Sequence, residues 1–147
     1  MPTFQQSVVI QKPPEVVFEF LANYENDPRW RSDVRTMAYQ SPPPIGVGSR
    51  ALEVASVLGQ QLETLTEISE YEPHARVISR TLSGPTPVTA YRYFEPTDGG
   101  TRFTYRLDID VSKALFFRLL QPVLIPWYQR RIETYLARAK EIVEAEY

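Results

Sequence analysis

The segment from Ser112 to Tyr147 constrains the fold most, because only Pro122 and Pro126 interrupt its helical character. It contains no glycine after Ser112, which is itself a suitable N-cap residue. About 33 helical residues would extend roughly 50 Å, further than a domain of this size is wide unless the helix bends. The sequence therefore predicts either one long C-terminal helix bent at the two prolines, or a separate short helix followed by a helix that begins at them.

The second half of this predicted helix has one mostly apolar face. Its members are three and four residues apart: Ile125, Gln129, Ile132, Leu136, Ala139 and Val143. The first half, residues 115–120, is apolar on most sides. Such a segment is either buried against a large concave partner or exposed at an opening that binds apolar material. The preceding residues must supply the partner surface.

The composition is typical of one soluble globular domain that spans residues 1–147. Hydrophobic residues make up 43% of the chain and charged residues 23%, which argues against disorder. The net charge of -2 gives no electrostatic reason to expect nucleic acid. No apolar stretch reaches the ~20 residues of a transmembrane helix. The N-terminus lacks a secretion signal, so we expect a cytoplasmic protein.

The residues before the C-terminal helix predict one strand, two short helices and about six further strands. The first strand covers residues 4–10, and the short helices begin at Pro14 and near Asn23. The further strands are expected at residues 34–40, 49–58, 61–72, 75–82, 88–95 and 101–111. Strands joined by short turns pair antiparallel, so we predict an α+β fold: a curved antiparallel sheet of about six or seven strands wrapped around the long helix.

The last strand shows the clearest alternation of apolar and polar residues. One face carries Phe103, Tyr105, Leu107, Ile109 and Val111, and the other carries polar residues that include Asp108 and Asp110. We expect the apolar face to pack on the long helix. The space between them is filled either by side chains alone or by side chains and a ligand.

Six short motifs lie in order along nearly the whole chain. They are Ile10–Phe18, Asn26–Trp30, Gly46–Ser49, Glu70–Pro73, Gly99–Phe103, and the set Leu136, Lys140 and Glu144. Together they resemble the START-like or SRPBCC superfamily with its helix-grip fold, most of all the branch described as polyketide cyclase/dehydrase and lipid transport. The resemblance implies this fold and a ligand cavity between sheet and helix. It names no ligand, because the superfamily includes cyclases, lipid carriers and hormone carriers.

The residues offer little for catalysis or metal binding. His74 is the only histidine, cysteine is absent, and no serine stands in a nucleophile-elbow context. The neighbouring acids Asp108 and Asp110 are assigned to the solvent face. We therefore expect no metal site and no cofactor, and we assign no catalytic residue.

The aromatic residues point to a binding pocket. They make up 12% of the chain, and tyrosines on cavity-facing strands suit a pocket that is apolar with a few polar groups. We predict these ligand-binding residues: Trp30, Leu52, Tyr91, Tyr105, Tyr128, Gln129 and Ile132. An outward position is the alternative for Tyr91, and a core position the alternative for Trp30. Arg80 and Arg92 are expected to pair with glutamates across the sheet, or else to point inward.

Three functions fit these features. The first is binding or transport of a small apolar or amphipathic molecule, such as a lipid, isoprenoid or polyketide, between sheet and helix. The second is an enzyme of the polyketide cyclase or dehydratase type. The third is a membrane-peripheral or protein-interaction module that exposes Phe116, Phe117 and Trp127. The lack of an obvious acid–base pair favours the first. The sequence determines neither the oligomeric state nor the protein partners.

Overall fold

The computed structural model describes residues 2–112 and 115–147, with all their side chains except those at positions 116 and 117. Seven strands form one sheet: β1 Thr3–Ile10, β2 Val34–Tyr39, β3 Arg50–Val57, β4 Gln60–Glu72, β5 Arg76–Ser83, β6 Val88–Thr97 and β7 Gly100–Ile109. The helices are α1 Pro14–Leu21, α2 Asp27–Trp30 and α3 Leu115–Glu146, with a 3-10 turn, η1 Tyr24–Asn26, before α2.

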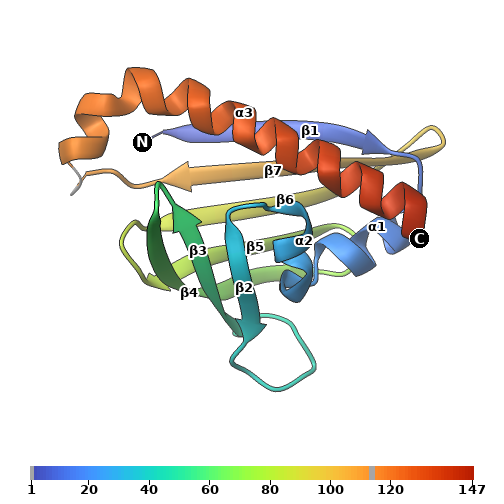
Figure 1. Cartoon of the computed structure of the whole chain (residues 1–147). Coiled ribbons are helices and arrows are strands. Elements are labelled where there is room, and N and C mark those ends of the chain that lie inside the picture. The colour runs from blue at the N-terminus through green and yellow to red at the C-terminus, as the bar shows by residue number, and fades with distance from the viewer. Residues whose placement is uncertain (1, 113–114) are drawn as a thin grey trace.

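The sheet is antiparallel throughout, in the order β1-β7-β6-β5-β4-β3-β2. It curls so that α3 runs across it near β1 and β7, while α1 and α2 lie beside the C-terminal end of α3 (Figure 1). Strands β2 to β7 follow one another directly, whereas β1 and β2 are separated by the short helices. This arrangement confirms the predicted α+β helix-grip fold with two short helices after the first strand.

The alternation predicted for β7 accounts for the concave side of the sheet. Phe103, Tyr105 and Leu107 are buried, and residues directly opposite on neighbouring strands share their face. Phe103 lies opposite Val8 of β1 and Phe94 of β6. One apolar surface therefore extends across three strands and faces the helices.

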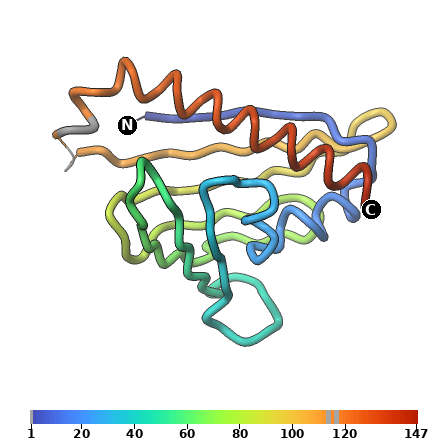
Figure 2. Tube along the Cα trace, in the orientation of Figure 1, coloured from blue at the N-terminus to red at the C-terminus, as the bar shows by residue number. Residues whose placement is uncertain are grey.

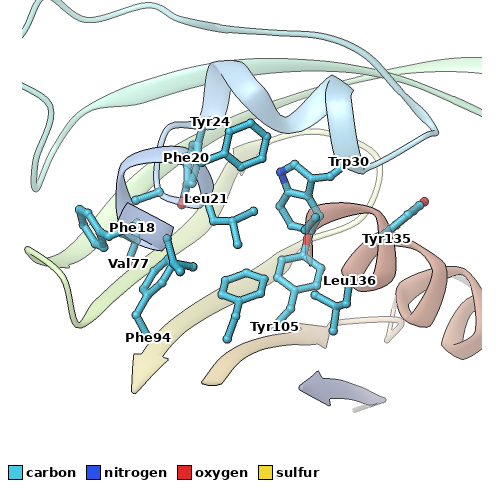
Figure 3. Close-up of a cluster of buried hydrophobic side chains, with 14 of the residues drawn as sticks. Phe18, Phe20, Leu21, Tyr24, Trp30, Val77, Phe94, Tyr105, Tyr135 and Leu136 are labelled. Carbon is cyan, nitrogen blue, oxygen red and sulfur yellow. The ribbon is translucent and has the colours of Figure 1, made fainter. Parts of the chain in front are cut away.

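The core lies between this surface and the helices (Figure 3). The buried ring of Trp30 meets Phe103 and Tyr105 edge-on, with centroid distances of 6.0 and 5.5 Å. Ile132 and Leu136 of α3 are buried in the same cluster. Full burial of one such side chain stabilises the fold by about 1.5–3 kcal/mol, so this cluster fixes α2 and α3 on the sheet.

α3 continues through Pro122 and Pro126, so no separate short helix precedes the prolines. In Figure 2 its orange N-terminal end departs from the straight course of its red C-terminal part, which agrees with the predicted bend. Each proline lacks a backbone donor and crowds the carbonyl group four residues earlier. The predicted N-cap, Ser112, is followed by residues 113 and 114, which lie outside the described part of the chain.

Polar side chains hold the C-terminal half of α3 along β1. Lys140 Nζ donates hydrogen bonds to the carbonyl oxygen of Val9 at 2.7 Å and to Glu144 Oε2 at 2.7 Å. The same Glu144 oxygen accepts a bond from the backbone nitrogen of Gln11 at 2.8 Å. The helix is therefore joined to the end of β1 by hydrogen bonds as well as by apolar packing.

Candidate functional site

A cavity lies between the concave side of the sheet and the N-terminal half of α3. Its outer chamber has a volume of about 210 Å³ and a mostly apolar lining, which includes Phe4, Val57, Leu62, Ile109 and Leu124. Pro2, Thr86 and Val111 also line it. These three come from strand ends and turns on the side where α3 begins (Figure 1). The outer chamber can therefore accommodate an apolar group.

An inner chamber of about 130 Å³ adjoins the outer one. Seven residues line both: Arg31, Glu53, Thr64, Thr86, Val88, Ile109 and Tyr128. The two chambers are therefore parts of one cavity. The inner lining is rich in polar side chains, among them Tyr24, Ser79, Arg92 and Tyr105. One end of the cavity thus favours polar groups and the other end apolar ones.

Four charged side chains form a network at the inner chamber, in which Asp27 and Arg92 are buried and Arg31 and Glu53 are partly buried. Asp27 is 0% exposed and accepts bonds from Arg92 Nη1 at 3.0 Å, Arg92 Nη2 at 2.5 Å and Arg31 Nη1 at 2.9 Å. Arg31 Nη1 also donates to Glu53 Oε1 at 2.7 Å. Arg92 Nη1 donates in addition to the carbonyl oxygen of Leu21 at 2.9 Å. The network joins α2, β3 and β6 around the polar end of the cavity.

Both arginines of this network stay protonated, because the pKa of each is raised. Burial alone would lower the pKa of each guanidinium group, but the neighbouring carboxylates more than offset this effect. The charge of Asp27 raises the pKa of Arg92, and the charges of Glu53 and Asp27 raise the pKa of Arg31. If one member of such an enclosed ion pair is removed, the remaining charge is buried without compensation, which destabilises the fold.

Three aromatic rings surround the Arg92 guanidinium group. Its Cζ atom lies 4.4 Å from the ring centroid of Tyr24, 5.2 Å from that of Trp30 and 5.7 Å from that of Tyr105. Cation–π attraction adds to the ion pair in holding the arginine. Burial raises the pKa of Tyr24 and of Tyr105, so both hydroxyl groups stay protonated and can donate hydrogen bonds.

A second polar cluster lies at the outer chamber. Arg131 Nε donates to Asp33 Oδ2 at 2.8 Å, Arg131 Nη2 donates to Asp33 Oδ1, and the Tyr135 hydroxyl donates to Asp33 Oδ2. The Arg131 Cζ atom also lies 4.8 Å from the centroid of the Trp127 ring. The cluster ties α3 to the link between α2 and β2.

The acidic side chains of the cavity are paired with arginines rather than grouped with one another. Within residues 2–112 and 115–147, no group of three or more histidines, aspartates or glutamates could hold a metal ion. None of the helices in this part of the chain is long and apolar enough to cross a membrane.

Comparison with known families gives a match over almost the whole sequence. The model of the family described as "Polyketide cyclase / dehydrase and lipid transport" matches residues 1–144. The chain belongs to this family. No curated protein matches its sequence significantly.

Solved structures share the fold of this family member at low sequence identity. TTHA0849 from Thermus thermophilus is 23% identical, with a TM-score of 0.83 over 98% of both chains. The Zhui aromatase/cyclase from Streptomyces sp. R1128 is 12% identical, with a TM-score of 0.74 over 97% of this chain and 93% of that one. Ara h 8.0201 is 16% identical, with a TM-score of 0.71 over 99% of both. At such identities the likeness concerns the fold alone.

Two of the predicted ligand-binding residues line the cavity. Tyr105 lines the inner chamber, and Tyr128 lines both chambers. Burial raises the pKa of Tyr128, so its hydroxyl group remains protonated where the two chambers meet. Their part in binding stays a prediction for this member of the polyketide cyclase / dehydrase and lipid transport family.

Three other predicted residues line neither chamber. Trp30 and Ile132 belong to the buried core, which for Trp30 is the alternative that the sequence left open. Gln129 lies at the edge of the sheet, where its Nε2 atom donates to the carbonyl oxygen of Gln5 at 3.4 Å. Trp30 still touches the site, because its ring packs on Tyr105.

Leu52 and Tyr91 lie on the opposite, convex face of the sheet. Tyr91 is directly opposite Arg106, whose Cζ atom lies 5.0 Å from the Tyr91 ring centroid. Its neighbour Arg92 is opposite Tyr105 and therefore shares the concave face. Leu52 faces outward because Glu53, the next residue, turns into the cavity to meet Arg31.

The sequence interpretation missed most of the buried charge network. For Arg92 the sequence favoured pairing across the sheet, as Arg80 does with Glu67 at 3.5 Å, but the structure shows the alternative, an inward position paired with Asp27. Glu53 was not singled out at all. One signal was available. Asp27 lies where the short helices η1 and α2 meet, and a carboxylate that is buried there requires a cationic partner.

Proposed function

We propose that this protein binds a small apolar or amphipathic molecule in the cavity between the sheet and α3, and acts as its carrier. The observation that carries the proposal is the division of the cavity into a mostly apolar outer chamber and a polar inner chamber. Small-molecule sites commonly combine apolar walls with a few polar groups that orient the ligand. Membership of a family named for cyclases and lipid transport agrees with this proposal.

Native mass spectrometry of the purified protein tests for a bound small molecule directly. Titration with 1-anilinonaphthalene-8-sulfonate or a similar apolar fluorescent probe then tests the location of the site. Val57 lines the outer chamber, so Val57→Trp should fill part of it and weaken probe binding about tenfold or more. The matched control is Val54→Trp on the same strand, because Val54 lines neither chamber.

The two tryptophan variants separate the cavity from the rest of the surface. Equal probe affinities in both variants, with the fold retained by circular dichroism, would show that the probe binds elsewhere. No bound molecule and no probe binding by the wild-type protein would contradict the carrier proposal.

Delivery of the ligand at a membrane surface is a second candidate function, favoured by an apolar stripe on α3. Leu115, Leu119 and Val123 are 67%, 72% and 70% exposed and follow one another at intervals of one helical turn. Residues 115–132 contain no acidic residue, and Arg118 and Arg130 add positive charge to this segment, whereas Arg131 is paired with Asp33. An apolar and basic helix face is typical of binding to anionic lipid surfaces. Phe116 and Phe117, which the sequence assigned to this surface, lie outside the described side chains.

Flotation with phosphatidylserine/phosphatidylcholine vesicles tests this second function. Leu119→Asp should abolish flotation, because it places a negative charge in the stripe that meets the anionic lipid. Val47→Asp is the control, since Val47 is 69% exposed but lies in the distant loop between β2 and β3. Equal flotation of both variants, or equal binding to pure phosphatidylcholine, would argue against the anionic membrane surface.

A further inference from the structure

A second hollow lies outside the ligand cavity, between α1 and the loop that joins β2 to β3. This α1 groove has a volume of about 610 Å³ and is open to solvent. Its walls are largely apolar and include Phe18, Tyr39, Ile45 and Tyr71. None of its lining residues lines either chamber of the ligand cavity. The groove is therefore a separate candidate for binding.

The α1 groove carries negative charge without a countercharge. Glu19 and Glu25 line it, and none of its described lining residues is a lysine or an arginine. Within residues 2–112 and 115–147 neither glutamate forms an ion pair, and the Glu25 carboxylate only accepts a bond from the backbone nitrogen of Tyr39 at 3.3 Å. The carboxylates of the ligand cavity, in contrast, are paired with arginines. The groove thus favours an occupant that is both apolar and cationic.

The N-terminal half of α3 has both properties. Its exposed apolar stripe consists of Leu115, Leu119 and Val123. Arg118 lies one turn from Leu115, and Arg130 lines the same shallow surface depression as Val123. Both arginines are exposed, and neither forms an ion pair within the described part of the chain. Docking of such a helix face, with apolar residues one turn apart, into an apolar groove is a common mode of protein recognition.

This half of α3 cannot reach the groove of its own chain. α1 lies beside the C-terminal end of α3, whereas the stripe lies near the N-terminal end (Figure 1). A helix of 32 residues extends roughly 48 Å, so the stripe and the groove are far apart in one molecule. A contact between them requires a second copy of the protein.

From these observations we infer that copies of the protein associate, with the α3 stripe of one copy in the α1 groove of another. This contact brings the unpaired arginines of one copy to the unpaired glutamates of the other. The inference goes beyond the proposed carrier function and does not depend on it. The stripe is also the surface that would meet a vesicle, so association and vesicle binding exclude one another.

Analytical ultracentrifugation of the ligand-free protein tests the association. The average mass of the wild type should rise above that of the monomer between about 10 μM and 1 mM. Ile45→Ser should move this rise to about tenfold higher concentration, because it removes an apolar wall of the groove. Val47→Ser is the matched control, since Val47 is exposed in the same loop but does not line the groove.

Charge reversal tests the pairing of the two surfaces. A groove variant combines Glu19→Arg with Glu25→Arg, and a helix variant combines Arg118→Glu with Arg130→Glu. Each variant alone should associate about tenfold or more weakly than the wild type, because like charges then meet. An equimolar mixture of the two should associate again, since each surface of one variant meets the opposite charge on the other.

Glu63→Arg combined with Asp98→Arg is the control for net charge. It changes the net charge as much as the groove variant does, at two exposed residues that do not line the groove. It should leave the association unchanged. Circular dichroism checks that every variant keeps its fold.

Three results would overturn the inference. They are a wild type that stays monomeric up to about 1 mM, equal association of the wild type and both charge variants, and a mixture that associates no better than its components. These experiments contain neither ligand nor lipid, so such results leave the carrier function intact. Failure of the carrier function is seen instead as the absence of a bound molecule in native mass spectrometry and of probe binding.

Discussion

Arg92 is buried although it is charged, and its surroundings account for this. Its guanidinium group is held by Asp27, by the carbonyl oxygen of Leu21 and by three aromatic rings. The pair is enclosed, so neither charge can turn to solvent when the other is removed. The loss of one partner therefore leaves an isolated charge in a region of low dielectric.

Arg92→Met should lower the free energy of unfolding by about 3–5 kcal/mol, as is typical when one member of a buried ion pair is removed. Urea denaturation followed by circular dichroism measures this loss. Arg80→Met is the control, because the Arg80 side chain, which pairs with Glu67 at 3.5 Å, is 62% exposed. An exposed pair contributes about 1 kcal/mol or less. Losses of similar size in the two variants would contradict the buried role of Arg92.

The alternation of apolar and polar residues in each strand determines which cavity residues could be predicted from the sequence. β7 has one apolar and one polar face, so alternation correctly placed Tyr105 on the concave side. β3 has apolar residues on both faces, with Leu52 and Val54 on one and Ala55 and Val57 on the other. Alternation alone cannot orient such a strand. Its orientation depends on the ion pair between Glu53 and Arg31, which are distant in sequence.

At the scale of single elements, the junction of α3 and β1 gives a prediction about pH. Hydrogen bonds from Lys140 and from the Gln11 backbone lower the pKa of Glu144 below its ordinary value of 4.5. A lowered pKa in the folded state contributes stability above the ordinary pKa, and this stability is lost as the pH falls through the lowered value. The melting temperature should therefore fall below about pH 4.5.

Glu144→Gln isolates this contribution. At pH 7 it should lower the melting temperature by about 2 °C, and it should weaken the decline below pH 4.5. Glu141→Gln provides the comparison, because Glu141 lies on the same helix but pairs only with exposed Arg138 at 3.2 Å. A steeper acid decline in Glu144→Gln than in the wild type would refute the expected sign.

The two prolines of α3 give another prediction at this scale. We expect the bent N-terminal end of the helix, with Leu119 and Leu120, to act as a movable flap over the cavity mouth. Pro122→Ala combined with Pro126→Ala should raise the melting temperature, because each proline removes a helical hydrogen bond. It should also slow exchange of the fluorescent probe in stopped-flow measurements. Unchanged exchange in a stabilised variant would show that the prolines affect stability only.

At the scale of the whole molecule, the fold could be predicted from the sequence, but the side chains that meet inside the cavity could not. Short turns between the strands require antiparallel neighbours, and the glycine-free C-terminal segment requires a long helix, so the architecture follows from local signals. The cavity depends on which side chains meet across β3, β6 and α2. Local patterns carry no information about such pairings.

The hydrogen bonds between α3 and β1 also affect whether two copies of the protein can associate by pairing their edge strands. The sheet does not close into a barrel, so β1 is an edge strand whose outer backbone groups could pair with a strand of another copy. The helix side chains of Gln129 and Lys140 already bind the carbonyl oxygens of Gln5 and Val9. They occupy positions that an added strand would need. The C-terminal helix thus protects this edge against aggregation through strand addition.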